Sequence, residues 1–254
     1  MLSELITTDI YRFLLIFTRL GTALMVMPGF GGATVPVRPR LVLALALSFL
    51  LLPVVGAQVP PLPRNPGGLA LLVLGEATVG FFLGMVAQVL ISALSIAGAF
   101  MGFQIGLTNA FSFDAIAQQQ SQLLSSFLST LALTAVFAGD LHHLMLRAVA
   151  DSYALFQPGQ PLPLDDFSTT ITHLLSGAMW LGLRMSAPIL VFGLVFYAGM
   201  GLLSRLVPQM QVFFIAVPVQ VLVGLWMLMV ALPVMMLLFL RSFESGMLPY
   251  LLPR

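Results

Sequence analysis

Residues 69–103 read LALLVLGEATVGFFLGMVAQVLISALSIAGAFMGF and carry a single charge, Glu76. A membrane-spanning helix needs about 20 apolar residues. This block is longer, so we predict a bent helix or a helical hairpin. Small residues allow membrane helices to approach closely, although glycine is also common in such helices without a packing role. Five glycines of the block are candidates for close helix contact: Gly75, Gly80, Gly84, Gly98 and Gly102.

Apolar blocks of similar character recur along the 254 residues, and hydrophobic residues make up 59% of the chain. The six blocks are Ile10–Pro28, Leu41–Val59, Leu69–Phe103, Leu123–Ala138, Leu174–Gly201 and Leu206–Leu240. Charged residues make up 7%, against roughly 25% in a soluble domain, so the chain cannot cover a soluble surface with polar groups. We therefore predict an all-α integral membrane protein, with kinked helices and helical hairpins, no β-sheet core and one domain over residues 1–254.

Composition excludes several classes of function. The ten basic residues are all arginine and the net charge is +1, which argues against a nucleic-acid-binding surface. The absence of cysteine excludes disulfides, thiol catalysis and cysteine metal sites. No phosphate-binding loop, nucleophile elbow or catalytic constellation is recognisable, so we predict no enzyme and no cofactor. The first residues lack a basic region and a cleavage site, so we expect the first apolar block to remain in the mature chain.

Ionisable residues inside apolar blocks are the first candidates for a functional site. Glu76 and Arg184 lie deepest in such blocks, and such groups usually have a buried partner or border an aqueous path. They could pair with each other or with another chain, and a proton-relay carboxylate is the alternative for Glu76. Residues 140–156 are predicted to form an amphipathic helix. The adjacent His142 and His143 should point in different directions on it, so we predict no metal site.

The polar connector Gly102–Gln122, GFQIGLTNAFSFDAIAQQQSQ, is unlike the blocks on either side. Phe111 and Phe113 would lie on one face of an extended backbone. Non-helical backbone at membrane depth is tolerated only when it is buried in protein or lines water. The connector is therefore either a re-entrant link or a loop that obstructs a pore.

A second informative stretch is Leu206–Phe213, LVPQMQVF. Pro208 is predicted to break the helix, and the amides of Gln209 and Gln211 can satisfy the backbone groups that the break frees. A simple hairpin tip is the alternative. The chain also has 15 methionines, which suit surfaces that must adapt to a variable cargo or simply face lipid.

These stretches resemble the FliR family, the flagellar biosynthesis proteins of the type III export gate, over essentially the whole chain. The motifs that carry the resemblance are Phe17-Thr18-Arg19, Met27-Pro28-Gly29-Phe30, Val35-Pro36-Val37-Arg38, Gly75-Glu76, Gly106–Asp114 with its glutamines, Asp140-Leu141-His142-His143, and Arg205–Phe213. The resemblance implies a non-enzymatic subunit that joins FliP and FliQ in a closed channel, with FlhB associated, in the bacterial inner membrane and flagellar basal body. Unfolded flagellar subunits would pass through this channel.

The resemblance also implies roles for individual residues. The plug would be Ile105–Gln122, with Ile105, Leu107, Phe111, Phe113 and Asp114 as gate residues. Ala115 stands where a helix-breaking proline would be expected. Glu76, Arg184 and Arg205 would be buried or contribute to assembly, and the chain would also contact lipid. Three other functions remain as alternatives: an injectisome export-gate subunit, a secondary transporter, and a scaffold with no role in gating.

Overall fold

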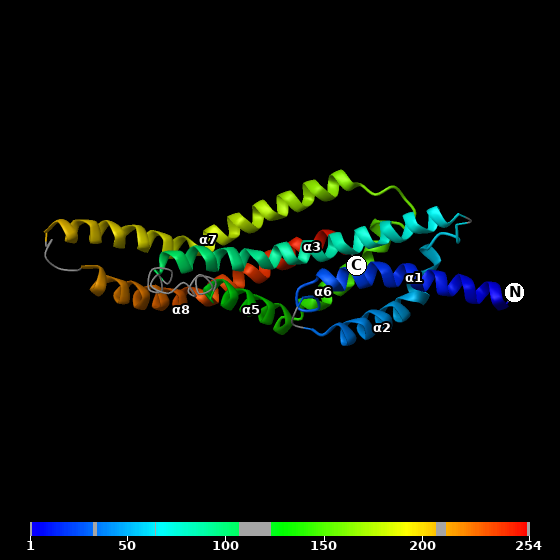
Figure 1. The fold of residues 1–254 in the computed structure, drawn as a ribbon, viewed down its shortest axis with the longest axis horizontal. Helices are drawn as coiled ribbons and strands as arrows, with labels where there is room; N and C mark the ends of the chain where they lie inside the picture. Colours follow the sequence, from blue (N-terminus) through cyan, green and yellow to red (C-terminus); the bar gives the residue numbers. More distant parts are fainter. Residues whose placement is uncertain (1, 33–34, 64, 107–122, 207–211, 253–254) are drawn as a thin grey trace. The chain divides into compact units, whose positions relative to one another are not determined.

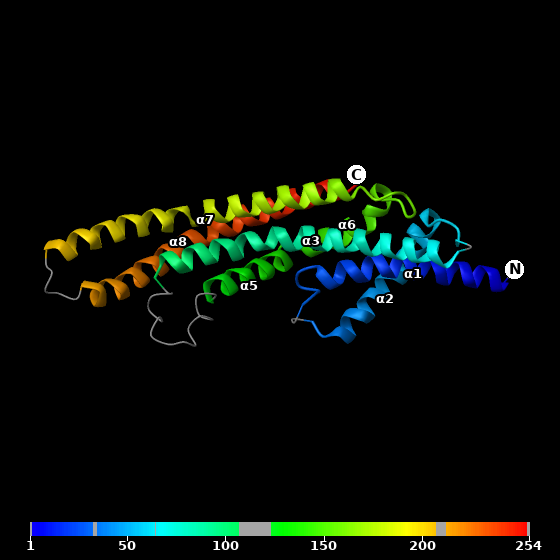
Figure 2. The ribbon, with the colours of Figure 1, turned by 45° about the horizontal axis from the view of Figure 1, so that its top comes forward.

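The computed structural model describes residues 2–32, 35–63, 65–106, 123–206 and 212–252, with side chains from residue 8 and, in the last range, from residue 216. Every regular element in these ranges is a helix, which confirms the all-α fold class (Figures 1 and 2). The α-helices are α1 (Leu2–Val26), α2 (Val37–Val55), α3 (Pro66–Gln104), α5 (Leu123–Ala138), α6 (Leu141–Leu155), α7 (Leu164–Leu206) and α8 (Val212–Met247). Two short 3-10 helices are η1 (Gly56–Gln58) and η3 (Leu248–Tyr250).

The chain forms two compact units. Unit 1 consists of residues 1–90, 137–174 and 243–254, and unit 2 consists of residues 91–136 and 175–242. The boundaries fall inside α3, α5, α7 and α8, so these four helices contribute to both units. The single domain expected from the sequence stays a prediction.

Unit 1 is built around α1, which packs on α2 and α6. Its buried cluster is formed by Tyr11, Leu15, Ile16, Val55, Val59 and Tyr153. A second contact is aromatic: the ring of Phe82 on α3 stacks on Phe167 of α7 at 4.1 Å between centroids, with Phe156 and Tyr250 against its edge. These rings pack α3, α7, η3 and the residue after α6 against one another.

In unit 2 the second part of α3 packs against α5, α7 and α8. The backbone of α5 approaches Gly98 so closely that a Cβ there would lie 2.6 Å from the Cα of Ser125. The hydroxyls of Ser95 and Ser125 lie 2.8 Å apart at this crossing, and Ser125 also donates to the carbonyl of Ser95. The prediction of close helix contact is confirmed at Gly80, Gly84 and Gly98.

The structure decides between a bent helix and a hairpin for the third apolar block, because residues 69–103 lie in one continuous helix, α3. In the sixth block, residues 212–240 lie in one helix, α8, which contains Pro218 and Pro233, and Leu206 is the last residue of α7. Prolines are tolerated in membrane helices because neighbouring groups satisfy the freed carbonyls. The amphipathic helix predicted for residues 140–156 is confirmed as α6, with Met145, Ala148 and Val149 buried.

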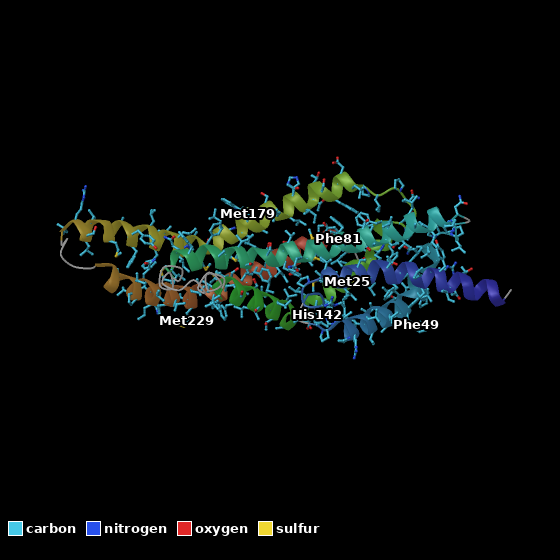
Figure 3. The ribbon with its side chains drawn as sticks, viewed as in Figure 1. Met25, Phe49, Phe81, His142, Met179 and Met229 are labelled. Atoms are coloured by element: carbon cyan, nitrogen blue, oxygen red, sulfur yellow. The ribbon has the colours of Figure 1, made fainter. Side chains whose placement is uncertain are left out.

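In the part of the chain that the structure describes, four helices are long and apolar enough to cross a membrane, and the bent pair α5–α6 would make a fifth span if it counts as one. The four are Val37–Gln58, Pro66–Gln104, Leu164–Leu206 and Ala216–Tyr250. Large apolar side chains such as Met25, Phe49, Phe81, Met179 and Met229 point outward (Figure 3). The chain is a membrane protein, and its outer apolar faces need lipid or protein against them.

Candidate functional site

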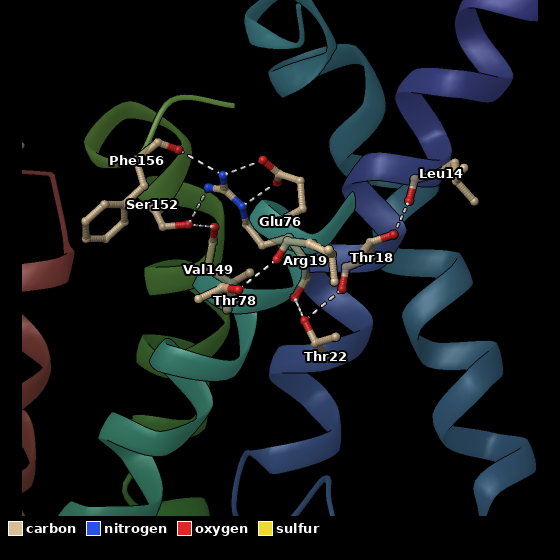
Figure 4. A network of polar contacts seen from close by, with 10 residues as sticks. Leu14, Thr18, Arg19, Thr22, Glu76, Thr78, Val149, Ser152 and Phe156 are labelled. Carbon is tan, nitrogen blue, oxygen red and sulfur yellow. Dashed lines mark hydrogen bonds and ion pairs between the residues drawn. The ribbon is translucent and has the colours of Figure 1, made fainter. Parts of the chain in front are cut away.

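The most buried charged group of the described chain is an ion pair between α1 and α3. Arg19 Nε donates to Glu76 Oε2 at 2.7 Å and Arg19 Nη2 donates to Glu76 Oε1 at 3.0 Å (Figure 4). The two side chains are 1% and 3% exposed. This two-pronged geometry is the strongest form of arginine–carboxylate contact, and it occupies both carboxylate oxygens.

The rest of the guanidinium is held by α6 and the residue after it. Arg19 Nη1 donates to Ser152 Oγ at 3.1 Å, and Nη2 also donates to the carbonyl of Phe156 at 2.8 Å. The Arg19 Cζ lies 3.9 Å from the centre of the Tyr153 ring, in a cation–π contact. Arg19 therefore ties α1, α3 and α6 together at one buried point of unit 1.

Helical spacing on α3 explains how the pair can form. Glu76, Gly80 and Gly84 recur every four residues and share one face of the helix. A Cβ at Gly80 would overlap the Arg19 carbonyl, and a Cβ at Gly84 would lie 2.7 Å from Val26 Cβ. The missing side chains let α1 approach α3, which brings the Arg19 and Glu76 side chains within bonding distance.

This arrangement suits a structural pair better than a proton relay. Two buried charges cost several kcal/mol each in desolvation, and only good geometry with further hydrogen bonds offsets that cost. Here the carboxylate has both oxygens bonded to a permanent cation, because arginine does not release its proton in proteins. A relay also needs several titratable groups along a path, and the hydrogen bonds that continue from the pair lead from Arg19 to the Ser152 hydroxyl and the Phe156 carbonyl.

The other two ionisable candidates behave differently. Arg184 and Arg205 are exposed on α7, so the expectation that they are buried is wrong within this chain. Glu76 pairs with Arg19 and not with Arg184. A contribution of Arg184 and Arg205 to assembly stays a prediction.

The end of α3 is the second candidate site, in unit 2. Ile105 is fully buried, and Gln220 of α8, 2% exposed, donates through Nε2 to the Gln104 carbonyl at 2.7 Å and to the Tyr197 hydroxyl at 3.0 Å. Gly106 has a φ of +79°, a left-handed conformation that ends helices. Ile105 is thus part of a packed helix end and not an exposed tip.

The remaining plug and helix-break candidates lie outside the described residues. They are Leu107, Phe111, Phe113, Asp114, Pro208, Gln209 and Gln211. Their roles stay predictions, as does the departure at Ala115. The helices flanking the predicted break end at Leu206 and begin at Val212.

Among the described residues, the group that could hold a metal is Asp140, His142 and His143, whose ligand atoms all lie within 4.8 Å of one another. The expectation that the two rings diverge is wrong, since their centroids are 4.0 Å apart. The reason is packing at the first turn of α6: the His142 ring stacks on Phe137 at 4.9 Å. The positive end of the helix disfavours a cation here, and the absence of a metal site stays a prediction.

A family model described as bacterial export proteins, family 1, matches residues 10–246, which include Arg19, Glu76 and Gln220. The chain belongs to this export family. The flagellar biosynthetic protein FliR of Caulobacter vibrioides is 36% identical over 224 residues, covering 88% of this chain and 89% of that protein. The FliR of Bacillus subtilis is 30% identical and that of Escherichia coli is 28% identical, covering 91% and 79% of this chain. The resemblance to the FliR family that the motifs indicated is confirmed.

The sequence identified Glu76 as an ionisable residue that needs a partner, but it did not identify Arg19 as that partner. One signal was available: a buried acid needs a buried base, and Glu76 shares its helix face with two glycines. Such a face predicts close contact with another helix but does not say which one. Gln220 was missed because a single glutamine in an apolar helix carries no further signal.

Proposed function

We propose that this chain is the FliR-type subunit of a flagellar type III protein export gate. It is a non-enzymatic membrane subunit that assembles with FliP and FliQ, with FlhB associated, in the bacterial inner membrane at the flagellar basal body. Its cargo is unfolded flagellar subunits. The observation that carries the proposal is the similarity to the Caulobacter vibrioides FliR, 36% over 88% of the chain.

One feature of the described residues supports an assembled state, and a second weighs against a transporter. Large apolar side chains are exposed along α2, including Val42, Phe49 and Val54 at 64–70%, and further ones line α7 and α8. Such surface is more than an isolated chain keeps in water, so subunits or lipid cover it. The closed Arg19–Glu76 pair leaves no free carboxylate oxygen for a transported ion, which weighs against a secondary transporter.

Gating belongs to the same proposal. The plug is Ile105–Gln122, with Phe111 and Phe113 obstructing the resting conduit. Replacing both phenylalanines by alanine should raise the ion leak through the assembled complex. Unchanged permeability with the complex intact refutes this role and favours a scaffold without a gate.

Native mass spectrometry tests the assembly. The chain is tagged, extracted gently from its own membranes and weighed with its partners. A large complex with one copy of this chain and several copies of two small membrane proteins supports the export gate. A folded monomer or homodimer refutes it and favours a transporter. Complementation of a flagellar mutant, in comparison with an injectisome mutant, distinguishes the two export systems.

A further inference from the structure

In unit 2, the C-terminal end of α3 packs tightly against α7 and α8. Ile105 donates its backbone N–H to the Met101 carbonyl at 2.8 Å, and Gly106 donates to the Phe103 carbonyl at 3.2 Å. The Ile105 side chain is 0% exposed. The helix is therefore capped and buried at the point where the chain leaves it.

Three consecutive residues at this end meet α7 or α8 at a glycine. The Gln104 side chain fills the space where a Cβ of Gly193 on α7 would be. A Cβ on Gly224 of α8 would lie 2.7 Å from Ile105 Cγ1. At Gly106 itself, a Cβ would lie 3.1 Å from the Gln220 amide carbon. Each contact is possible only because one partner lacks a side chain.

Hydrogen bonds also join the end of α3 to α7 and α8. Gln220 is 2% exposed and donates both to the Gln104 carbonyl and to the Tyr197 hydroxyl, and so joins α3, α7 and α8. The Gln104 carbonyl is one of those that a helix end leaves without an intrahelical partner. In apolar surroundings an unsatisfied polar group is costly, so separation of the helix end from α8 is opposed by both packing and hydrogen bonding.

We propose that Gln220, Gly193 and Gly224 are positioning residues that keep the end of α3 docked while the export channel opens. We call residues 104–106 together with these three residues the anchor. The inference rests on the proposed function, because it states that the anchor stays docked in both the closed and the open export channel.

A cysteine pair tests whether the anchor stays closed. The chain has no cysteine of its own, so Ile105→Cys with Gly224→Cys introduces the only pair. A Cβ on Gly224 would lie 3.2 Å from Ile105 Cβ, close to the about 3.5–4.5 Å that a disulfide spans, and the smaller cysteine vacates room at position 105. The control pair is Ile105→Cys with Gly201→Cys, because Gly201 has open space around it.

The expected result is a disulfide in the assembled complex for the first pair and none for the control, with equal export by the oxidised and reduced complexes. Absence of the disulfide, or export that stops on oxidation and returns on reduction, overturns the inference. The disulfide is scored on gels without any export assay. If deleting this chain leaves flagellar export intact, the proposed function fails, while the disulfide still reports the docked helix end.

A leak assay separates positioning from mere support of the fold. Gln220→Leu removes two buried hydrogen bonds, which should enlarge the undocked population roughly tenfold and raise the resting leak of assembled complexes. Gly224→Ala should act in the same direction, and Gly199→Ala, in open space on α7, should not. Assembled Gln220→Leu complexes that leak no more than the unmodified complex overturn the positioning role.

Discussion

Replacing Arg19 by alanine is expected to destabilise the chain strongly, and with it the proposed export-gate complex, because it leaves the Glu76 carboxylate buried without its cation. Both partners are almost fully buried, and the carboxylate has both oxygens bonded to Arg19. Removing one member of such a pair costs about 3–5 kcal/mol. A whole domain is stable by about 5–15 kcal/mol, so the loss would be a large part of the total.

The same reasoning predicts that the double variant Arg19→Met/Glu76→Leu is less harmful than either single change. Replacing a buried ion pair by apolar side chains is often neutral or stabilising. Here the carbonyl of Phe156 loses its donor from Arg19, which costs about 1–3 kcal/mol. The double variant should therefore lie within about 3 kcal/mol of the original chain.

The assay is the temperature at which the purified complex releases this chain, measured by size exclusion after heating. Arg19→Ala should lower it by roughly 10 °C, at about 2–4 °C per kcal/mol for a chain of this size. The matched control is Arg12→Ala on the same helix. Its contact to Asp9 is 3.6 Å long with side chains 37% and 61% exposed, and exposed pairs contribute about 0–1 kcal/mol.

Two results would refute the reasoning. A double variant as unstable as Arg19→Ala would show that the pair is not the source of the effect. Normal assembly with lost export in Glu76→Ala or Glu76→Gln would assign Glu76 to transport and not to structure.

Other consequences follow from unit 1. Tyr153→Phe should leave the complex as stable or more stable, because the buried Tyr153 hydroxyl has no hydrogen-bond partner among the described residues. Tyr153→Leu should lower the release temperature, because it removes the aromatic ring that contacts the Arg19 guanidinium. Gly84→Ala should destabilise by about 1–3 kcal/mol through overlap with Val26, measured in the same heating assay. Gly67→Ala, with open space on the same helix, should be neutral, and equal effects at the two glycines would contradict the close crossing.

Periodicity and composition were sufficient for much of the fold because they depend on local physics. A block without charges must leave water, and helices are the way such a block satisfies its own backbone in a membrane. Two alternatives, a bent helix and a hairpin, were left open for the third block. Length alone permitted a hairpin, but nothing in residues 69–103 supplies a turn, and the prolines of α8 are accommodated within the helix.

The sequence by itself determined an all-helical membrane chain, the amphipathic α6, the family, and the fact that Glu76 needed a partner. Only the tertiary structure decided that this partner is Arg19, that Arg184 is exposed, and that Ile105 packs against Gly224 of α8. Helix formation follows from residues a few positions apart. Which residue pairs with Glu76 depends on which helix packs against the glycine face of α3. That packing brings together segments that are distant in the chain.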